Sequence, residues 1–239
     1  KYAWAVPCTY GEAGVSLYEE FKALSAVVHA SGSDEQPAEE FLLVGGDTSG
    51  IQDFLYTITY KAAAKGLRGR SFFLQLLSDA TVRAILRELD LPWTNVVYAA
   101  GGNFLILAPA GQEVENRLEH FASAFNHILL EVTRGELNLV LGWTAIRAAA
   151  VGDPATWREG VKKVKEKQAQ AKAQPFADVA NKNWEAVFGP TDGGGKQYCA
   201  ICHCGLEEAE GKVLEREAGR EILACDLCYS FGILAEEIR

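Results

Sequence analysis

A glycine-rich turn after the first strongly apolar run holds the side chains best suited to binding a phosphate and its metal ion. The run at 41–44 leads into Gly45-Gly46-Asp47-Thr48-Ser49-Gly50-Ile51-Gln52. Glycines let a backbone approach a ligand closely, and a carboxylate such as Asp47 is a ligand that Mg²⁺ prefers. The spacing of Ser49 and Gln52 fits a capping box, and free amides at a helix start attract phosphate. The candidate ligand-binding residues of this turn are Asp47, Thr48, Ser49, Gly50 and Gln52; the alternative is that they only cap a helix.

A second turn, Gly101-Gly102-Asn103, joins two apolar runs at 96–100 and 104–108. Glycine and asparagine accept the positive φ of a tight hairpin, so turn geometry alone could account for all three residues. Asn103 brings no negative charge, and a two-metal phosphoryl transfer needs carboxylates to hold both ions. Gly101, Gly102 and Asn103 are therefore candidate binding residues, and the chain is expected to carry no catalytic residue.

Five of the six cysteines lie between Cys199 and Cys228, which predicts a metal centre. Cys199-Ala-Ile-Cys202 and Cys225-Asp-Leu-Cys228 are two C-x-x-C pairs separated by 22 residues. Four thiolates from such pairs form a closed structural Zn²⁺ site, so the predicted ligands are Cys199, Cys202, Cys225 and Cys228. Cys204 and His203 are spare candidates, and a redox pair or free buried cysteines are the alternatives. Loss of zinc is expected to unfold this tail and leave the preceding domain folded.

The composition is that of a globular protein in a reducing compartment. Of 239 residues, 49% are hydrophobic, no apolar run approaches the roughly 18 residues of a membrane span, and no signal peptide opens the chain. Clustered cysteines and these absences predict a cytoplasmic protein with no membrane partner. A net charge of −9 argues against general nucleic-acid coating, but the basic run at 61–70 could hold phosphates or form a solvated loop. The chain does not begin with an initiator methionine, which indicates a piece of a longer protein.

Hydrophobic periodicity places these turns in an α+β fold. We expect helices at 15–30, 50–60, 71–90 and about 114–129, strands at 41–46 and 137–146, and a hairpin at about 95–108. Strand, helix, hairpin, helix and strand form a ferredoxin-like βαββαβ palm with helices on one face of a four-stranded antiparallel sheet. The predicted domains are a linker helix and loop at 1–40, a cyclase- or polymerase-like palm at 41–152, and a helical segment with a small zinc-binding module at 153–239. In this topology the first strand ends beside the hairpin tip.

The residues at 46–56 and the run Lys-Gly-Leu-Arg-Gly-Arg-Ser within 65–77, with the Gly-Gly-Asn hairpin and the cysteine pairs, resemble a known family. That family is the large subunit of type III-A CRISPR effector complexes, the Csm-type Cas10 protein, and the resemblance runs from about residue 15 to the end. Its members cut single-stranded DNA with a nuclease domain and make cyclic oligoadenylates from ATP between two palms. Their second palm carries Gly-Gly-Asp-Asp, which is absent here. The resemblance implies the first palm and the zinc module.

The resemblance further implies a nucleotide-binding half-site for ATP with Mg²⁺ or Mn²⁺, in a protein of antiviral defence. Partners implied in the same way are the other effector subunits, guide RNA and target RNA indirectly, and single-stranded DNA through a nuclease domain. The longer protein is expected to be an enzyme, and this chain alone to be inactive. The alternative is a purely structural palm and zinc scaffold for assembly of the complex.

Overall fold

The computed structural model describes residues 6, 14–32, 38–56, 63–189, 197–206, 211–217 and 220–238. Its main elements up to the sheet's last strand are α1 (Leu17–Ala30), β1 (Glu40–Ser49), α2 (Ile51–Tyr56), α3 (Ala63–Glu88), β2 (Val96–Ala100), β3 (Asn103–Pro109), α4 (Gln112–Thr133) and β4 (Asn138–Arg147). The later elements are α5 (Pro154–Lys172), α6 (Ala177–Lys182), α7 (Trp184–Phe188), β5 (Gln197–Tyr198), β6 (Gly205–Leu206), β7 (Lys212–Glu217), β8 (Arg220–Ala224) and α8 (Asp226–Glu237). Among the helices in these ranges, none combines the length and apolar character that crossing a bilayer requires.

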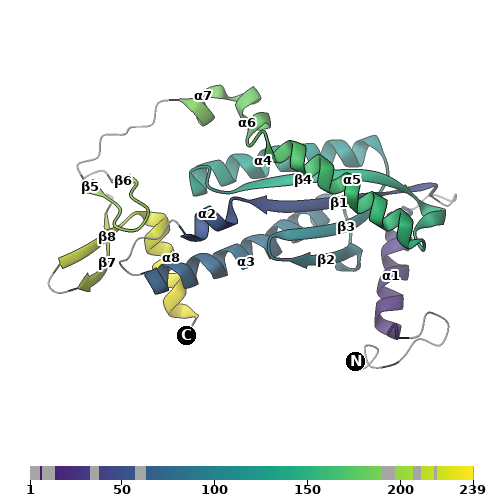
Figure 1. The fold of residues 1–239 in the computed structure, drawn as a ribbon, viewed down its shortest axis with the longest axis horizontal. Helices are drawn as coiled ribbons and strands as arrows, with labels where there is room; N and C mark the ends of the chain where they lie inside the picture. The colour runs from purple at the N-terminus through teal and green to yellow at the C-terminus, as the bar shows by residue number, and fades with distance from the viewer. Residues whose placement is uncertain are drawn as a thin grey trace. The chain divides into compact units, whose positions relative to one another are not determined.

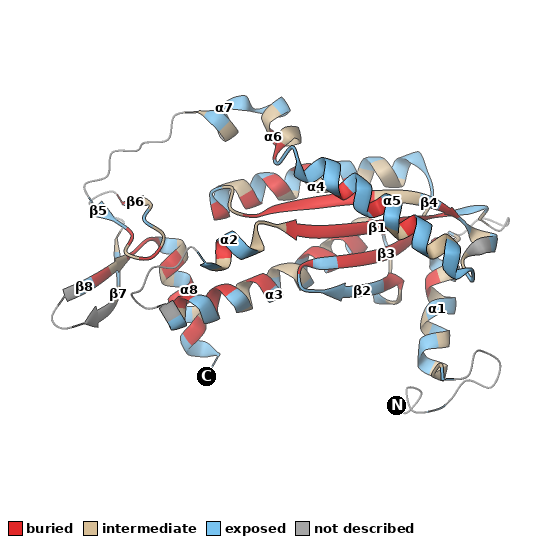
Figure 2. Ribbon diagram, viewed as in Figure 1, coloured by how far each residue is buried: buried red, intermediate tan, exposed pale blue. Residues whose placement is uncertain are grey.

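Four strands form one sheet in the order β2-β3-β1-β4, with β3 antiparallel to both β1 and β2. This confirms a mixed fold of helices and an antiparallel sheet. β1 is buried from Phe41 to Thr48 because it is a central strand covered on both faces, whereas the edge strand β2 is exposed from Val97 onward (Figure 2).

Helices cover both faces of the sheet, because α1 and α5, which lie outside the predicted palm, cover the face opposite to the palm helices α3 and α4 (Figure 1). Phe41, Leu43, Leu105 and Leu107 share a cluster with residues of α1 and α5. The alternate positions of the same strands, such as Leu42 and Ile106, point to the opposite face and are also buried. Figure 1 shows α5 crossing in front of β1 and β4, with α3 and α4 behind the sheet.

Glycines let α5 lie close to the sheet, a use that sequence periodicity does not reveal. A Cβ on Gly142 of β4 would lie 2.7 Å from the Val164 carbonyl oxygen, and a Cβ on Gly45 of β1 would lie 2.4 Å from Val164 Cγ1. From the helix side, a Cβ on Gly160 would meet Ile146 and Leu43 at 3.1 and 3.2 Å. The polar, lysine-rich sequence of α5 therefore packs through a narrow strip of small residues.

The helical boundaries differ from the expectations mainly at α3, which begins at Ala63 rather than 71. The basic run at 61–70, for which a phosphate site and a solvated loop were the alternatives, forms the first two turns of this helix from Ala63 onward. The cysteine-containing tail is also less helical than expected, because β5–β6 and β7–β8 are two short antiparallel pairs. Within the described part of that region, α8 is the one helix.

The chain divides into two compact units, each made of three separated stretches. The first contains residues 1–47, 79–122 and 140–174, and the second contains residues 48–78, 123–139 and 175–239. The second unit has its own apolar cluster around Phe54, Leu74, Leu137 and Phe231. The cysteines therefore share a unit with α2, the first half of α3 and the end of α4. The predicted domain limits at 40 and 152 stay a prediction.

Candidate functional site

The end of β1 and the hairpin tip lie side by side, as the sequence predicted. Asp47 of β1 pairs in register with Asn103, the first residue of β3, and Asn103 also pairs with Ala100 across the hairpin. Gly101 and Gly102 form the two-residue tip with φ of +61° and +84°. These angles fit a type I′ turn, so hairpin geometry accounts for both glycines.

Asp47 is buried and forms an ion pair with Lys172 at the end of α5. The Asp47 side chain is 10% exposed and the Lys172 side chain is 44% exposed, so the pair sits at the edge of the solvent. The ammonium group supplies the positive charge that a metal ion would otherwise bring to this carboxylate. Sequence reasoning missed Lys172, because the pair joins residues 125 positions apart (172 − 47) and no local spacing points to it.

The remaining residues of the first turn have structural roles that sequence reasoning did not separate from ligand binding. A Cβ on Gly46 would overlap the Phe104 ring at 1.9 Å. Gly50 has φ +92°, and a Cβ there would lie 2.0 Å from the Glu136 carbonyl oxygen. Both glycines are therefore required by close packing.

The capping box predicted at Ser49 and Gln52 is wrong by one residue. β1 continues through Ser49, and the Phe54 amide donates to the Gly50 carbonyl, which makes Gly50 the N-cap of α2. Thr48 is buried, and Gln52 is exposed on α2.

The basic run offers fewer free charges than its sequence indicates. Arg70 is 1% exposed, so it faces the protein interior and not a solvent-side phosphate. Lys65 forms an ion pair with Glu236. Arg68 is exposed, and Lys61 lies outside the described residues.

The cysteines converge as a metal site requires. The sulfur atoms of Cys199, Cys202, Cys204 and Cys225 all lie within 4.8 Å of one another, and Cys202 Sγ is 3.7 Å from Cys225 Sγ. Zn–S bonds of about 2.3 Å in a tetrahedron place sulfur atoms about 3.8 Å apart, so the donors fit Zn²⁺. Among the residues that the structure describes, this group contains no histidine, and all five cysteines of the tail are free thiols. Cys204 thus competes with Cys228 for the fourth ligand position.

Hydrogen bonding among the thiols separates their acidities. The side chain of Cys202, followed by those of Cys225 and Cys228, lowers the pKa of the Cys199 thiol. The same contact with Cys199 raises the pKa of Cys202. Cys228 therefore also lies within reach of Cys199, although it falls outside the 4.8 Å group.

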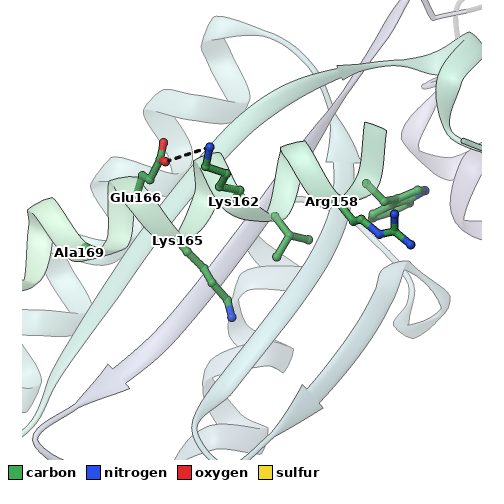
Figure 3. Close-up of a pocket in the computed structure, with 7 residues that line it drawn as sticks. Arg158, Lys162, Lys165, Glu166 and Ala169 are labelled. Atoms are coloured by element: carbon green, nitrogen blue, oxygen red, sulfur yellow. Dashed lines mark ion pairs between the residues drawn. The ribbon is translucent and has the colours of Figure 1, made fainter. Parts of the chain in front are cut away.

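A shallow hollow of about 640 Å³ lies along α5 (Figure 3). All seven lining residues belong to this helix: Trp157, Arg158, Val161, Lys162, Lys165, Glu166 and Ala169. Lys162 and Glu166 pair across one helical turn. Because a single helix lines it, the hollow lacks the converging polar groups of a ligand pocket.

A family model described as domain B of the Csm1 subunit matches residues 40–190 of the chain. The chain belongs to the Csm1 family. Curated Csm1 relatives include the type III-A CRISPR single-strand-specific deoxyribonuclease Cas10/Csm1 of Methanocaldococcus jannaschii, 30% identical over 216 residues. The corresponding Thermococcus onnurineus protein is 30% identical over 244 residues. The match covers 84% and 95% of this chain but only 26% and 30% of these relatives.

Solved Csm1 structures share the fold. A Csm1–Csm4 cassette in complex with cA4 is 26% identical, with a TM-score of 0.63 over 89% of this chain and 30% of that chain. A cassette in complex with one ATP is 30% identical, with a TM-score of 0.62 over 73% of this chain and 26% of that chain. These similarities confirm the family that the motifs predicted. The individual site residues remain predictions.

Proposed function

We propose that this chain is the first, ferredoxin-like palm and the zinc module of a longer Csm1-type protein of antiviral defence, and that it supplies a nucleotide-binding half-site for oligoadenylate synthesis. The pairing of Asp47 with Asn103, beside Lys172, is the observation that carries this proposal. It places one carboxylate, one amide and one amine at the end of the central strand. The relatives' complexes with ATP and cA4 give the class of ligand.

In the proposed half-site, Asp47 binds the Mg²⁺ or Mn²⁺ that accompanies ATP, and Lys172 moves from the carboxylate to a phosphate oxygen. A lysine ammonium is a flexible point charge and can make this exchange without backbone movement. Thr48, Ser49, Gly50, Gln52, Gly101, Gly102 and Asn103 complete the proposed binding residues. No carboxylate replaces Asn103, so the acids for catalysis come from a second palm.

The test is calorimetric titration of ATP with Mg²⁺ into the longer protein that contains this chain. Asp47→Asn is expected to weaken ATP binding about tenfold or more, the range of one charge-assisted contact. Lys162→Met is the control, because Lys162 lies on α5 like Lys172 but pairs with Glu166 on the exposed face of that helix. Equal affinities for Asp47→Asn and the control would remove Asp47 from the site.

A structural scaffold is the second candidate, favoured by the Asp47–Lys172 pair itself. A buried carboxylate that already has a counter-ion needs no metal, and the turn glycines are explained by packing. If this reading is correct, Asp47→Asn lowers the free energy of unfolding and leaves ATP affinity unchanged.

We also propose one Zn²⁺ held by Cys199, Cys202, Cys225 and Cys228, which supplies folding energy and no chemistry. The proposed partners are the remaining effector subunits, including a Csm4-type subunit, with guide and target RNA bound indirectly and single-stranded DNA cut by another domain in the cytoplasm. Metal analysis of the purified protein tests the zinc assignment, which predicts one zinc per chain.

A further inference from the structure

Arg70 is a buried cation with incomplete compensation. Its side chain is 2% exposed, and among the described residues its Nε has no hydrogen-bond partner. One terminal nitrogen donates to the Phe54 carbonyl oxygen, and the other lies 3.6 Å from Cys228 Sγ. The guanidinium carbon also lies 4.8 Å from the centre of the Phe54 ring.

The carboxylate that faces Arg70 is a weak counter-ion. Glu136 Oε2 lies 3.9 Å from the Arg70 nitrogen, beyond hydrogen-bond distance. Burial raises the pKa of Glu136, and Arg70 only partly opposes this shift. A guanidinium removed from water needs a nearby negative charge, and the cysteine sulfur lies closer than the carboxylate.

Arg134 approaches the cysteine cluster from a different element. It follows α4 directly, in a left-handed conformation with φ +53°. One of its terminal nitrogens lies 3.9 Å from both Cys202 Sγ and Cys225 Sγ. Two arginines, one on α3 and one between α4 and β4, thus contact sulfur atoms from both C-x-x-C pairs.

These contacts place positive charge beside the thiolates of the proposed metal centre. Four thiolates around one Zn²⁺ carry a net charge of −2, which two guanidinium groups balance. We infer that Arg70 and Arg134 are positioning residues that compensate the metal centre and make its occupancy a condition for ordering α2, the first half of α3 and the turn after α4. This inference rests on the proposed zinc site, and it replaces the expectation that zinc loss unfolds the tail alone.

Close packing transmits the effect within the second unit. A Cβ on Gly69 would lie 2.0 Å from the Phe231 carbonyl oxygen, so α3 and α8 are in direct backbone contact beside Arg70. Phe54 and Phe231 lie in edge-to-face contact, with ring centres 5.7 Å apart. Gly50 in turn packs on the carbonyl of Glu136. Movement of α8 or of the Arg134 turn therefore reaches the start of α2.

The first experiment measures amide hydrogen exchange of the chain with zinc bound and after chelation. We expect residues 51–56 and 63–78 to exchange at least tenfold faster without zinc, while α5 in the other unit keeps its rate as an internal control. Unchanged exchange in 51–56 and 63–78 with zinc demonstrably removed would overturn the inference and leave the zinc site standing. If the purified chain holds no zinc, both the zinc assignment and the inference fail.

The second experiment measures zinc affinity by competition with a chromophoric chelator. Arg134→Met is expected to lower affinity about tenfold at unchanged stoichiometry, as loss of an outer-shell partner typically does, and Arg134→Lys to restore part of it. Arg158→Met on α5 is the matched control. The test uses Arg134 because it is exposed, whereas Arg70 is buried beside Phe54 and the Arg70→Met protein is at risk of misfolding. A zinc affinity of Arg134→Met equal to that of Arg158→Met would contradict the inference.

Discussion

At the scale of single residues, the position of Asp47 is compatible with two roles, a metal ligand in a nucleotide site and one half of a structural ion pair. Asp47 has the position of a metal ligand but already has Lys172 as a counter-ion. Lys172 lies on α5, whose sequence is polar and lysine-rich and by itself indicates only a solvated helix. Asp47 itself could be predicted from its place after an apolar strand, whereas Lys172 could not, because only the crossing of α5 over the sheet brings it there.

The fourth zinc ligand can be decided by comparing two serine substitutions. Cys228→Ser is expected to reduce zinc affinity sharply, because Cys228 is buried next to Cys199 and pairs with Cys225 in a C-x-x-C step. Cys204→Ser is the control and is expected to keep one zinc per chain, with little change in affinity. Zinc content and chelator competition measure both. The reverse result would assign the position to Cys204, in agreement with the 4.8 Å group.

At the scale of elements, local pattern predicted most of the helices and strands but not the contacts between them. The apolar stripe of α4 and the two-residue tip of the β2–β3 hairpin follow from periodicity and turn residues. In a sequence, glycines such as Gly45 and Gly46 of β1 can indicate the close approach of either a ligand or another structural element. The structure shows that Gly45 packs against α5 and Gly46 against Phe104, contacts that the sequence alone does not reveal.

Gly142→Ala and Gly160→Ala test how α5 docks on the sheet. A Cβ at Gly142 meets a backbone carbonyl at 2.7 Å, so we expect a loss of about 1–3 kcal/mol in the free energy of unfolding. A Cβ at Gly160 meets only side-chain methyl groups at 3.1 and 3.2 Å, and its helix gains about 1 kcal/mol in propensity. Urea unfolding should therefore show a clear loss for the first and a small change for the second; equal losses would argue against the docking geometry.

The start of α5 should be sensitive to acid. The Asp153 carboxylate caps this helix by accepting hydrogen bonds from the Thr156 hydroxyl and from the backbone amides of Ala155 and Thr156. These bonds, the one from the hydroxyl most of all, lower the pKa of Asp153 from its usual value of 3.8. Because the pKa is lower in the folded state than in the unfolded state, the charged carboxylate stabilises the fold at pH values above the unfolded-state pKa. This stabilisation is lost as the pH falls through the folded-state pKa.

We therefore expect Asp153→Ala to speed hydrogen exchange in the first turn of α5 near pH 7, where the wild-type carboxylate is charged. The difference from the wild type should shrink once the pH falls below the folded pKa of Asp153. Glu159→Ala, further along the same helix, serves as the control. A difference that persists after the Asp153 carboxylate has become fully protonated would contradict a capping role for the charge.

At the scale of the whole molecule, the chain is a member of the Csm1 family that covers 26% and 30% of the lengths of its Methanocaldococcus jannaschii and Thermococcus onnurineus relatives. The motifs predicted the family because they combine several independent short matches in one order. They did not predict the two interleaved units, because the contacts that define the second unit join residues such as Arg70 and Cys228, which lie 158 positions apart.

The isolated chain is expected to produce no oligoadenylate from ATP, even with Mg²⁺ or Mn²⁺ at saturating concentration. One carboxylate at the end of β1, with Asn103 opposite, cannot hold the two ions of an in-line phosphoryl transfer. Chromatographic separation of the products measures this, with the longer protein as the positive control. Robust synthesis by the isolated chain would place the catalytic acids within it.

The interleaved second unit has a consequence for how the chain is made. Arg70 leaves the ribosome 158 residues before Cys228, which at about 5–20 residues per second is a delay of roughly 8–30 s. Throughout that time Arg70 and the apolar surface of Phe54 lack α8, which later covers them. The nascent chain therefore exposes a basic and aromatic surface until α8 emerges, and a polypeptide released before that point keeps the surface open to chaperones and proteases.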